Sequence, residues 1–167
     1  RLEDGGPVFF RQQRLGRGNC YFGMYKFRSM SFDASDHHGH ASTARNDQRV
    51  TRVGRFIRRT SIDEIPQLLN VLKGEMSLVG PRPHALGSRV DDQLFWEIES
   101  RYWNRHSLKP GLTGLAQVMG LRGATDVASD LTDRVSYDLE YISRWSPWRD
   151  LWIMALTVRV LWHNKAY

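Results

Sequence analysis

Two adjacent carboxylates, Asp63 and Glu64, are the residues of this sequence whose types and spacing point most directly to chemistry. Arg58 and Arg59 precede them closely, and Arg82 follows in a proline-rich turn. Arginine offers paired donors to phosphate oxygens, whereas carboxylates repel a phosphate unless a cation lies between them. A hard cation such as Mg²⁺ would bridge carboxylate and diphosphate oxygens. The pattern therefore predicts phosphate chemistry, in which one carboxylate attacks phosphorus and forms an acyl phosphate.

The residues around this acidic pair predict the start of a helix. Ser61 and Glu64 have the spacing of a capping box, Pro66 is tolerated near a helix start, and the apolar run that follows ends at Gly74. The free N–H groups at such an end attract anions. A simpler explanation remains open, because acidic residues are common in first helical turns, where they complement the helix dipole.

The elements that must position this pair follow from local patterns. Two runs of aromatic and β-branched residues, 7–12 and 21–27, flank a glycine-rich turn and predict a β-hairpin. Apolar residues recur at helical spacing among five arginines in 49–59, which predicts a basic amphipathic helix.

The second half of the chain is expected to be largely helical. We expect a helix over 90–102, a short strand over 115–118, and helical structure from about 130 to 162 that is interrupted at Ser146-Pro147. Residues 110–114, rich in glycine, form either a loop that faces a nucleotide or a plain turn.

Length and composition predict one folded domain over residues 1–167, because 41% of the residues are hydrophobic and 25% are charged. A single cysteine, Cys20, excludes an internal disulfide. The 24 Lys and Arg outnumber the 18 Asp and Glu, so the net charge of +6 indicates an anionic partner: nucleic acid, a phosphorylated substrate or lipid headgroups. No motif of a nucleic-acid reader is visible, and we expect no nucleic-acid partner.

Five blocks of the sequence resemble the bacterial sugar transferase family, the monotopic polyprenyl-phosphate phosphoglycosyl transferases, in family order and over nearly the whole chain. They read GPVFFRQQRLG, YKFRSM, RVTRVGRFIRRTSIDEIPQLLNVLKGEMSLVGPRP, KPGLTGLAQVMGLRG and RVSYDLEYISRWSPWRDLWIMALTVRVL, with NKAY at the end. We expect an α+β fold: a small antiparallel β-hairpin, a helix that carries the acidic pair, and amphipathic helices at the membrane interface.

The resemblance implies a reaction in two steps. Asp63 would attack the β-phosphorus of a UDP-sugar, expel UMP and hold the sugar phosphate covalently, and undecaprenyl phosphate would then take it. Glu64 would assist with Mg²⁺, which the acidic pair would bind, and with activating the acceptor. Arg58 and Arg82, which keep the family's spacing from the pair, would support phosphate binding.

Three further residues are placed near the site by the resemblance: Lys26 and Arg28 of the second block and Asp138 of the last. Each has another explanation. Lys26 and Arg28 alternate with aromatic residues, so they could form the solvated face of a strand. Asp138 could be a surface partner of Arg134 at i, i+4.

Two segments, one rich in histidine and one rich in tryptophan, each allow two interpretations. His37, His38 and His40 lie in a stretch of small polar residues without a second ligand cluster, so we expect a solvated loop there, not a metal site. The segment 141–162 combines tryptophan with arginine, which suits either a core helix or the membrane interface. Given a lipid-linked acceptor, we expect contact with anionic headgroups at the cytoplasmic face of the bacterial inner membrane.

The blocks are most similar to family members that transfer glucose 1-phosphate in exopolysaccharide assembly, and galactose 1-phosphate is the close alternative. No residue of the sequence decides between epimeric sugars. In this family a membrane-inserted helix precedes the first block. A non-enzymatic membrane-binding or nucleic-acid-binding module is the alternative of a different class, and it would leave Asp63 and Glu64 without a task.

Overall fold

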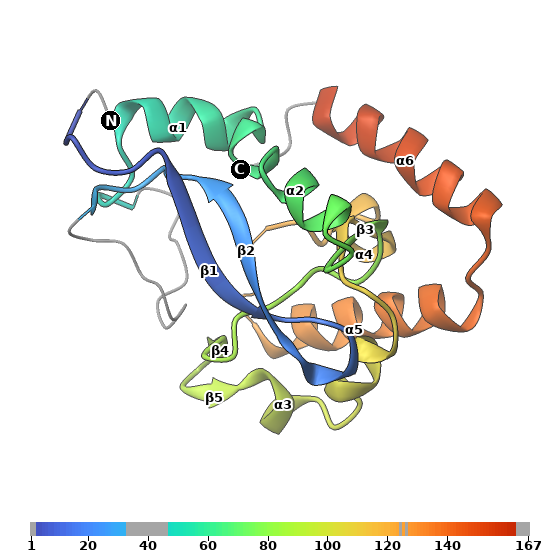
Figure 1. The fold of residues 1–167 in the computed structure, drawn as a ribbon. Helices are drawn as coiled ribbons and strands as arrows, with labels where there is room; N and C mark the ends of the chain where they lie inside the picture. The colour runs from blue at the N-terminus through green and yellow to red at the C-terminus, as the bar shows by residue number, and fades with distance from the viewer. Residues whose placement is uncertain (1–2, 33–46, 124, 126, 163–167) are drawn as a thin grey trace.

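The computed structural model describes residues 3–32, 47–123, 125 and 127–162, and in these the chain mixes helices with three small two-stranded sheets (Figure 1). This arrangement agrees with the expected α+β class. The segment with His37, His38 and His40 lies outside the described residues. The elements in chain order are β1 (Phe9–Leu15), η1 (Arg17–Asn19), β2 (Tyr21–Phe27), α1 (Arg52–Arg59), η3 (Ile62–Glu64), α2 (Gln67–Leu72), β3 (Ser77–Val79), β4 (Arg89–Val90), β5 (Gln93–Leu94), α3 (Phe95–Ile98), η4 (Tyr102–Ser107), β6 (Gly111–Thr113), α4 (Leu115–Val118), α5 (Ala128–Ser143) and α6 (Pro147–Trp162), where η marks a 3₁₀ helix.

The predicted β-hairpin is confirmed. Strands β1 and β2 pair antiparallel from Phe9 opposite Phe27 to Leu15 opposite Tyr21, and they form the long ribbon that runs diagonally through Figure 1. The turn between them requires a left-handed backbone, which Gly18 adopts without steric cost at φ 65°. The hairpin presents β2 to the helices that follow.

The helix expected over 49–59 is present as α1, and it begins at Arg52. The Thr51 side chain caps it by accepting a hydrogen bond from the Gly54 N–H at 2.9 Å. A side chain at position 54 would not fit, since a Cβ there would lie 1.9 Å from the carbonyl oxygen of Ser29. Close packing of α1 on the chain after β2 therefore fixes this glycine.

The predicted capping box is wrong. Ser61 adopts a left-handed conformation (φ 58°, ψ 16°) and its side chain caps nothing, while Asp63 and Glu64 lie in the single turn η3. The helix that follows, α2, begins only at Gln67, after Pro66, and Gly74 ends it as expected, with φ 77°. Long-range partners of Glu64, described below, engage the side chain that a capping box would need.

Two expectations for the second half are also wrong. Residues 90–102 form the small hairpin β4–β5 followed by only one turn of helix, α3, because Asp91 and Asp92 turn the chain with positive φ. Residues 115–118 are helical (α4), and the strand is β6, which pairs parallel with β3. A Cβ on Gly111 would lie 2.1 Å from the nitrogen of Gly80, so this glycine permits the pairing.

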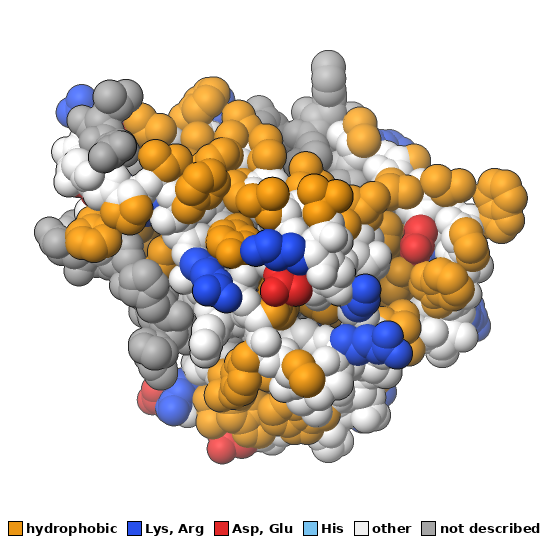
Figure 2. Space-filling model, viewed as in Figure 1, with side chains coloured by type: hydrophobic (Ala, Val, Ile, Leu, Met, Phe, Trp, Pro, Cys, Tyr) orange, Lys and Arg blue, Asp and Glu red, His pale blue; other side chains and the backbone are white. Residues whose placement is uncertain are grey.

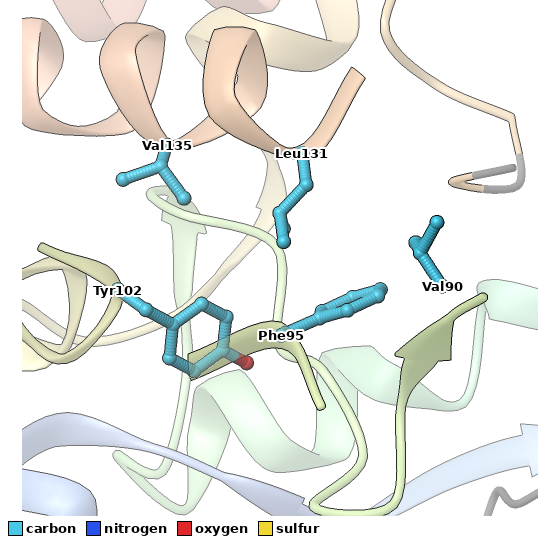
Figure 3. Packing of buried hydrophobic residues seen from close by; sticks show 5 residues of the cluster. All are labelled: Val90, Phe95, Tyr102, Leu131 and Val135. Carbon is cyan, nitrogen blue, oxygen red and sulfur yellow. The ribbon is translucent and has the colours of Figure 1, made fainter. Parts of the chain in front are cut away.

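The core has two parts, both built on the C-terminal helices α5 and α6, whose interruption at Ser146-Pro147 is confirmed. The first packs α5 against α3 and η4 (Figure 3), and its members are Val90, Phe95, Tyr102, Leu131 and Val135. The second joins β3, α4, α5 and α6 through Val79, Leu115, Tyr141 and Ile153. Together the two parts of the core pack α5 and α6 against the rest of the described chain.

Candidate functional site

The acidic pair lies where the hairpin meets α1 and α2, and one buried amide holds this junction together. Asn70 of α2 is fully buried, donates to the carbonyl oxygen of Gly23 at 2.9 Å, and accepts from the N–H of Tyr25 at 3.0 Å. Because these bonds tie α2 to β2, the next inward residue of the strand, Lys26, is brought beside η3.

Glu64 is clamped by two cations. Its oxygen Oε1 lies 3.2 Å from Lys26 Nζ and accepts from Arg82 at 2.7 Å. Within the described residues, its other oxygen has no hydrogen-bond partner. Burial would raise the pKa of Glu64, but Arg82 and Lys26 outweigh burial and hold this pKa well below its usual range. Glu64 is therefore a stable anion.

Asp63 differs from Glu64 in the partners of its carboxylate. Its side chain is only 8% exposed, yet among the described residues nothing donates a hydrogen bond to its carboxylate. Burial raises the pKa of Asp63, and the nearby cations Lys26, Arg58 and Arg82 oppose that rise. A carboxylate that is poorly solvated and unpaired is more basic and more reactive than one in water. The geometry thus distinguishes a poorly solvated carboxylate from one that is held in ion pairs.

Of the three arginines predicted at the site, Arg58 and Arg82 lie near the acidic pair and Arg28 does not. Arg82 binds Glu64 directly, and Arg58 of α1 acts on Asp63 through its charge. Arg28 is held elsewhere: its guanidinium pairs with Asp4 and donates to the carbonyl oxygen of Pro7 at 2.6 Å. Lys26 and Arg28 are both largely buried, so the alternative of a solvated strand face is wrong for both.

Asp138 lies in the interior, behind the acidic pair. It is 2% exposed and accepts two hydrogen bonds from Arg105 of η4, one of them at 3.0 Å from Nε. The alternative of an exposed surface pair with Arg134 is therefore wrong, because both side chains are buried. Asp138 reaches the site through Arg105, which donates to the carbonyl oxygen of Arg82 at 2.9 Å.

Two residues of this interior network were not predicted from the sequence, Arg105 and His84. Arg105 Nη1 lies 2.8 Å from His84 Nδ1, which also lies 3.2 Å from the hydroxyl of Tyr102. Burial and the charge of Arg105 hold the pKa of His84 far below its ordinary value, so the ring is neutral and accepts from Arg105. Neither residue belongs to a local pattern that marks it as part of a site, although Arg105 closely follows the aromatic-rich stretch 95–103.

A cavity of about 320 Å³ opens beside Glu64. Its walls are mostly apolar, and its polar lining includes Ser61 and Arg122, whose guanidinium donates to the Ser61 hydroxyl at 2.6 Å. The cavity lies between α2 on one side and α4 and α6 on the other, with β3 and β6 at its base; its lining residues are Ser61, Glu64, Ile65, Leu68, Leu78, Leu112, Thr113, Gln117, Val118, Arg122, Met154, Thr157 and Val160.

The donor set of the acidic pair fits a hard cation. The Asp63 carboxylate and the second oxygen of Glu64 are without hydrogen-bond partners in the described part of the chain. Mg²⁺ is typically bound by one or two protein carboxylates plus substrate phosphates and water. No group of three or more His, Cys, Asp or Glu side chains is assembled among the described residues, so the remaining ligands would have to come from a phosphate-bearing substrate or from water.

The surface around the site has a charged part and an apolar part. In Figure 2 an acidic group flanked by basic groups lies near the centre of the face, and hydrophobic side chains gather along its upper edge over α1, α2 and α6. Exposed apolar residues of these helices include Phe56 of α1 and Trp148 of α6, which are 58% and 79% exposed. Among the described helices, none has the length and apolarity needed to cross a bilayer.

The chain is similar to known sugar transferases over almost its whole length. The family model described as bacterial sugar transferase matches residues 1–164. An undecaprenyl-phosphate glucose phosphotransferase of Komagataeibacter xylinus is 54% identical over 95% of this chain and 30% of its own length. A UDP-glucose:undecaprenyl-phosphate glucose-1-phosphate transferase of Xanthomonas campestris pv. campestris is 48% identical over 100% of this chain and 34% of its own. A galactosyl transferase, CpsE, of Streptococcus agalactiae is 43% identical over 95% of this chain and 35% of its own.

The chain thus spans about a third of the length of these relatives. The family match, by contrast, covers almost every residue, including the acidic pair, its cationic clamp and the buried Arg105–Asp138 pair. The chain belongs to the bacterial sugar transferase family.

Proposed function

We propose that the protein containing this chain transfers glucose 1-phosphate from UDP-glucose to undecaprenyl phosphate and releases UMP. One observation carries the proposal: Asp63 is a buried carboxylate without a hydrogen-bond partner among the described residues, beside a second carboxylate that two cations keep ionised. The names of the relatives from Komagataeibacter xylinus and Xanthomonas campestris pv. campestris support the choice of donor and acceptor.

In the first step, an oxygen of Asp63 attacks the β-phosphorus of the UDP-sugar. The bond from this phosphorus to the bridging oxygen breaks, and UMP leaves with the electron pair. The sugar phosphate is then held on Asp63 as an acyl phosphate. Lys26, Arg58 and Arg82 lie near the carboxylates and would stabilise the charge that develops on the phosphate oxygens.

In the second step, a phosphate oxygen of undecaprenyl phosphate attacks the same phosphorus. A diphosphate bond forms, the bond to Asp63 breaks, and the carboxylate is restored. Glu64 is a weak base because its pKa is held low, and an ionised phosphate needs no strong base to attack. We therefore assign Glu64 the task of holding Lys26 and Arg82 in place.

Mg²⁺ fits this site as a partner of the substrate. Asp63 and the second oxygen of Glu64 would hold the ion together with diphosphate oxygens, and when bound it would neutralise charge on the diphosphate. The protein's own cations then orient the phosphates, and burial of Asp63 limits the access of water to the acyl phosphate.

The apolar edge of Figure 2 supports placing the protein on the cytoplasmic face of the bacterial inner membrane. Trp148, Leu151 and Trp152 of α6 and Val53 and Phe56 of α1 are all at least 47% exposed. Tryptophan favours the interface, because its ring has one apolar side and one polar N–H. Arginines of α1 would meet anionic headgroups.

Galactose 1-phosphate is a second candidate for the transferred group, because the relative from Streptococcus agalactiae is named a galactosyl transferase. The two donors differ in one hydroxyl, so the choice depends on a few hydrogen bonds. A nucleic-acid-binding or membrane-binding module without activity would not need a buried reactive carboxylate.

The test is a panel of UDP-sugars supplied to the full-length protein with Mg²⁺ and undecaprenyl phosphate, with UMP as the readout. We expect UMP release with UDP-glucose, and none from the Asp63→Asn variant. UMP at background with every donor would overturn the proposal, and release with UDP-galactose alone would favour the second candidate.

A further inference from the structure

We infer that the apolar cavity beside Glu64 receives the phosphate end of the isoprenoid acceptor, with Arg122 as the residue that binds its phosphate. This inference rests on the proposed function and deepens it, because it names the place and the residue that would distinguish acceptor from donor.

The lining of the cavity matches a branched hydrocarbon. Seven of its lining residues carry apolar side chains: Ile65, Leu68, Leu78, Leu112, Val118, Met154 and Val160. A nucleotide or a sugar would present polar groups that such walls cannot satisfy. At about 320 Å³ the cavity holds only a small part of a polyprenyl chain, so only the units next to the phosphate would enter.

The positive charge of Arg122 at the cavity suits the phosphate end of the same lipid. The guanidinium of Arg122 lines the cavity, and the bond it donates to the Ser61 hydroxyl leaves its remaining N–H groups without hydrogen-bond acceptors among the described residues. Arginine with free N–H groups binds phosphate oxygens well. Arg122 donates to Ser61, and Ser61 directly precedes the turn η3 that carries the acidic pair. A phosphate bound at Arg122 would therefore lie near that turn.

The cavity also opens in the direction from which a lipid would come. Ile65, Leu68 and Leu78 line it, and they are between 42% and 51% exposed, so its mouth is continuous with exposed apolar surface on α2 and β3. Figure 2 shows that hydrophobic side chains continue from α2 to α6 along the same edge. An isoprenoid could therefore pass from the bilayer to the cavity without crossing polar surface.

Two variants and two matched controls test this inference in the full-length protein. Arg122→Gln removes the charge but keeps a donor for Ser61, and Arg144→Gln is its control because Arg144 is exposed at the end of α5. Leu68→Gln makes the wall polar, and Leu69→Gln is its control because Leu69 is equally exposed on the same helix but does not line the cavity.

Two readouts separate the half-reactions. Exchange of labelled UMP into UDP-glucose without any lipid reports the first step alone, and the KM for undecaprenyl phosphate reports use of the acceptor. We expect Arg122→Gln to raise this KM by about tenfold or more and Leu68→Gln by several-fold, with exchange rates within about twofold of the wild type. The two controls should change neither readout.

An unchanged acceptor KM in both cavity variants would overturn the inference, and so would loss of UMP exchange in Arg122→Gln, since Arg122 would then serve the donor. A change of oligomeric state in Leu68→Gln without a change in KM would assign the cavity to a second copy of the protein and also overturn it. Absence of UMP exchange in the wild type would instead contradict the proposed function itself.

Discussion

Arg105 donates a hydrogen bond to the main-chain carbonyl oxygen of Arg82 at 2.9 Å. The same guanidinium is completely buried and paired with Asp138, so the turn that carries Arg82 is fixed from below by an interior ion pair. From this fixed turn the side chain of Arg82 binds Glu64, so the charge around the acidic pair depends on residues that do not touch the pair.

Asp138→Asn should destabilise the protein by about 3–5 kcal/mol, because it leaves the charge of Arg105 buried without its partner. Replacing both residues, as Arg105→Met with Asp138→Leu, should recover most of that stability, since apolar groups of similar volume need no partner. Denaturant unfolding measures both effects. The double variant should still lose activity, because nothing then holds the carbonyl of Arg82; full activity would show that Arg82 does not depend on this pair.

Asp63→Asn should stabilise the protein at neutral pH by about 1 kcal/mol while it lowers turnover by at least about a thousandfold. Burial raises the pKa of Asp63, so the folded state disfavours its charge. The wild type therefore loses stability as the pH rises from the unfolded pKa near 4 through the raised folded pKa, and the amide variant does not. Urea unfolding across this range gives the comparison.

The exposed residue Asp133 provides a control for Asp63→Asn. Asp133→Asn changes the net charge equally and should leave both stability and turnover unchanged. Equal stability of Asp63→Asn and the wild type at neutral pH would contradict the idea that Asp63 is held in an unfavourable ionised state.

Glu64→Gln should act in the opposite direction, with a loss of roughly 2 kcal/mol of stability at pH 7. Arg82 and Lys26 lower the pKa of Glu64 below its usual value, so this carboxylate stabilises the fold above the unfolded pKa. That contribution is lost progressively as the pH falls from the unfolded pKa near 4 towards the lower folded pKa, so the variant and the wild type should approach each other in acid. A difference in stability that stayed constant from pH 7 to pH 3 would rule out the ion pairs as its source.

His106 should make stability fall on mild acidification. Burial and the nearby charge of Arg105 lower its pKa to about 4, so between pH 6.5 and 4 the unfolded chain binds a proton that the folded chain does not. The shift corresponds to a loss of about 3 kcal/mol over this range. His106→Gln, which can still donate to Asn19, should reduce the slope of stability against pH, although His84 contributes with the same sign. An unchanged slope would contradict the assignment.

The sequence was sufficient to find the acidic pair, the hairpin and the two C-terminal helices, because each depends on residue type or on local periodicity. It failed for the capping box at Ser61, since the partners of Glu64 are Lys26 and Arg82, 38 and 18 residues away. Local spacing contains no information about such partners.

Short elements failed for a related reason. The apolar run at 115–118 is too short to distinguish strand from helix by pattern, and the parallel pairing of β3 with β6 decided the outcome. Arg105 was missed because a buried arginine looks like any surface arginine until its partner, Asp138, is placed beside it.

The central claim, that Asp63 itself carries the sugar phosphate, is tested most directly by mass spectrometry of the full-length protein after incubation with UDP-glucose and Mg²⁺ in the absence of lipid, followed by acid quench and proteolysis. We predict one added hexose phosphoryl group on the peptide that contains Asp63, lost when undecaprenyl phosphate is added and never formed by Asp63→Asn. Stoichiometric UMP release with that peptide unmodified, or with the group on another residue, would contradict the account.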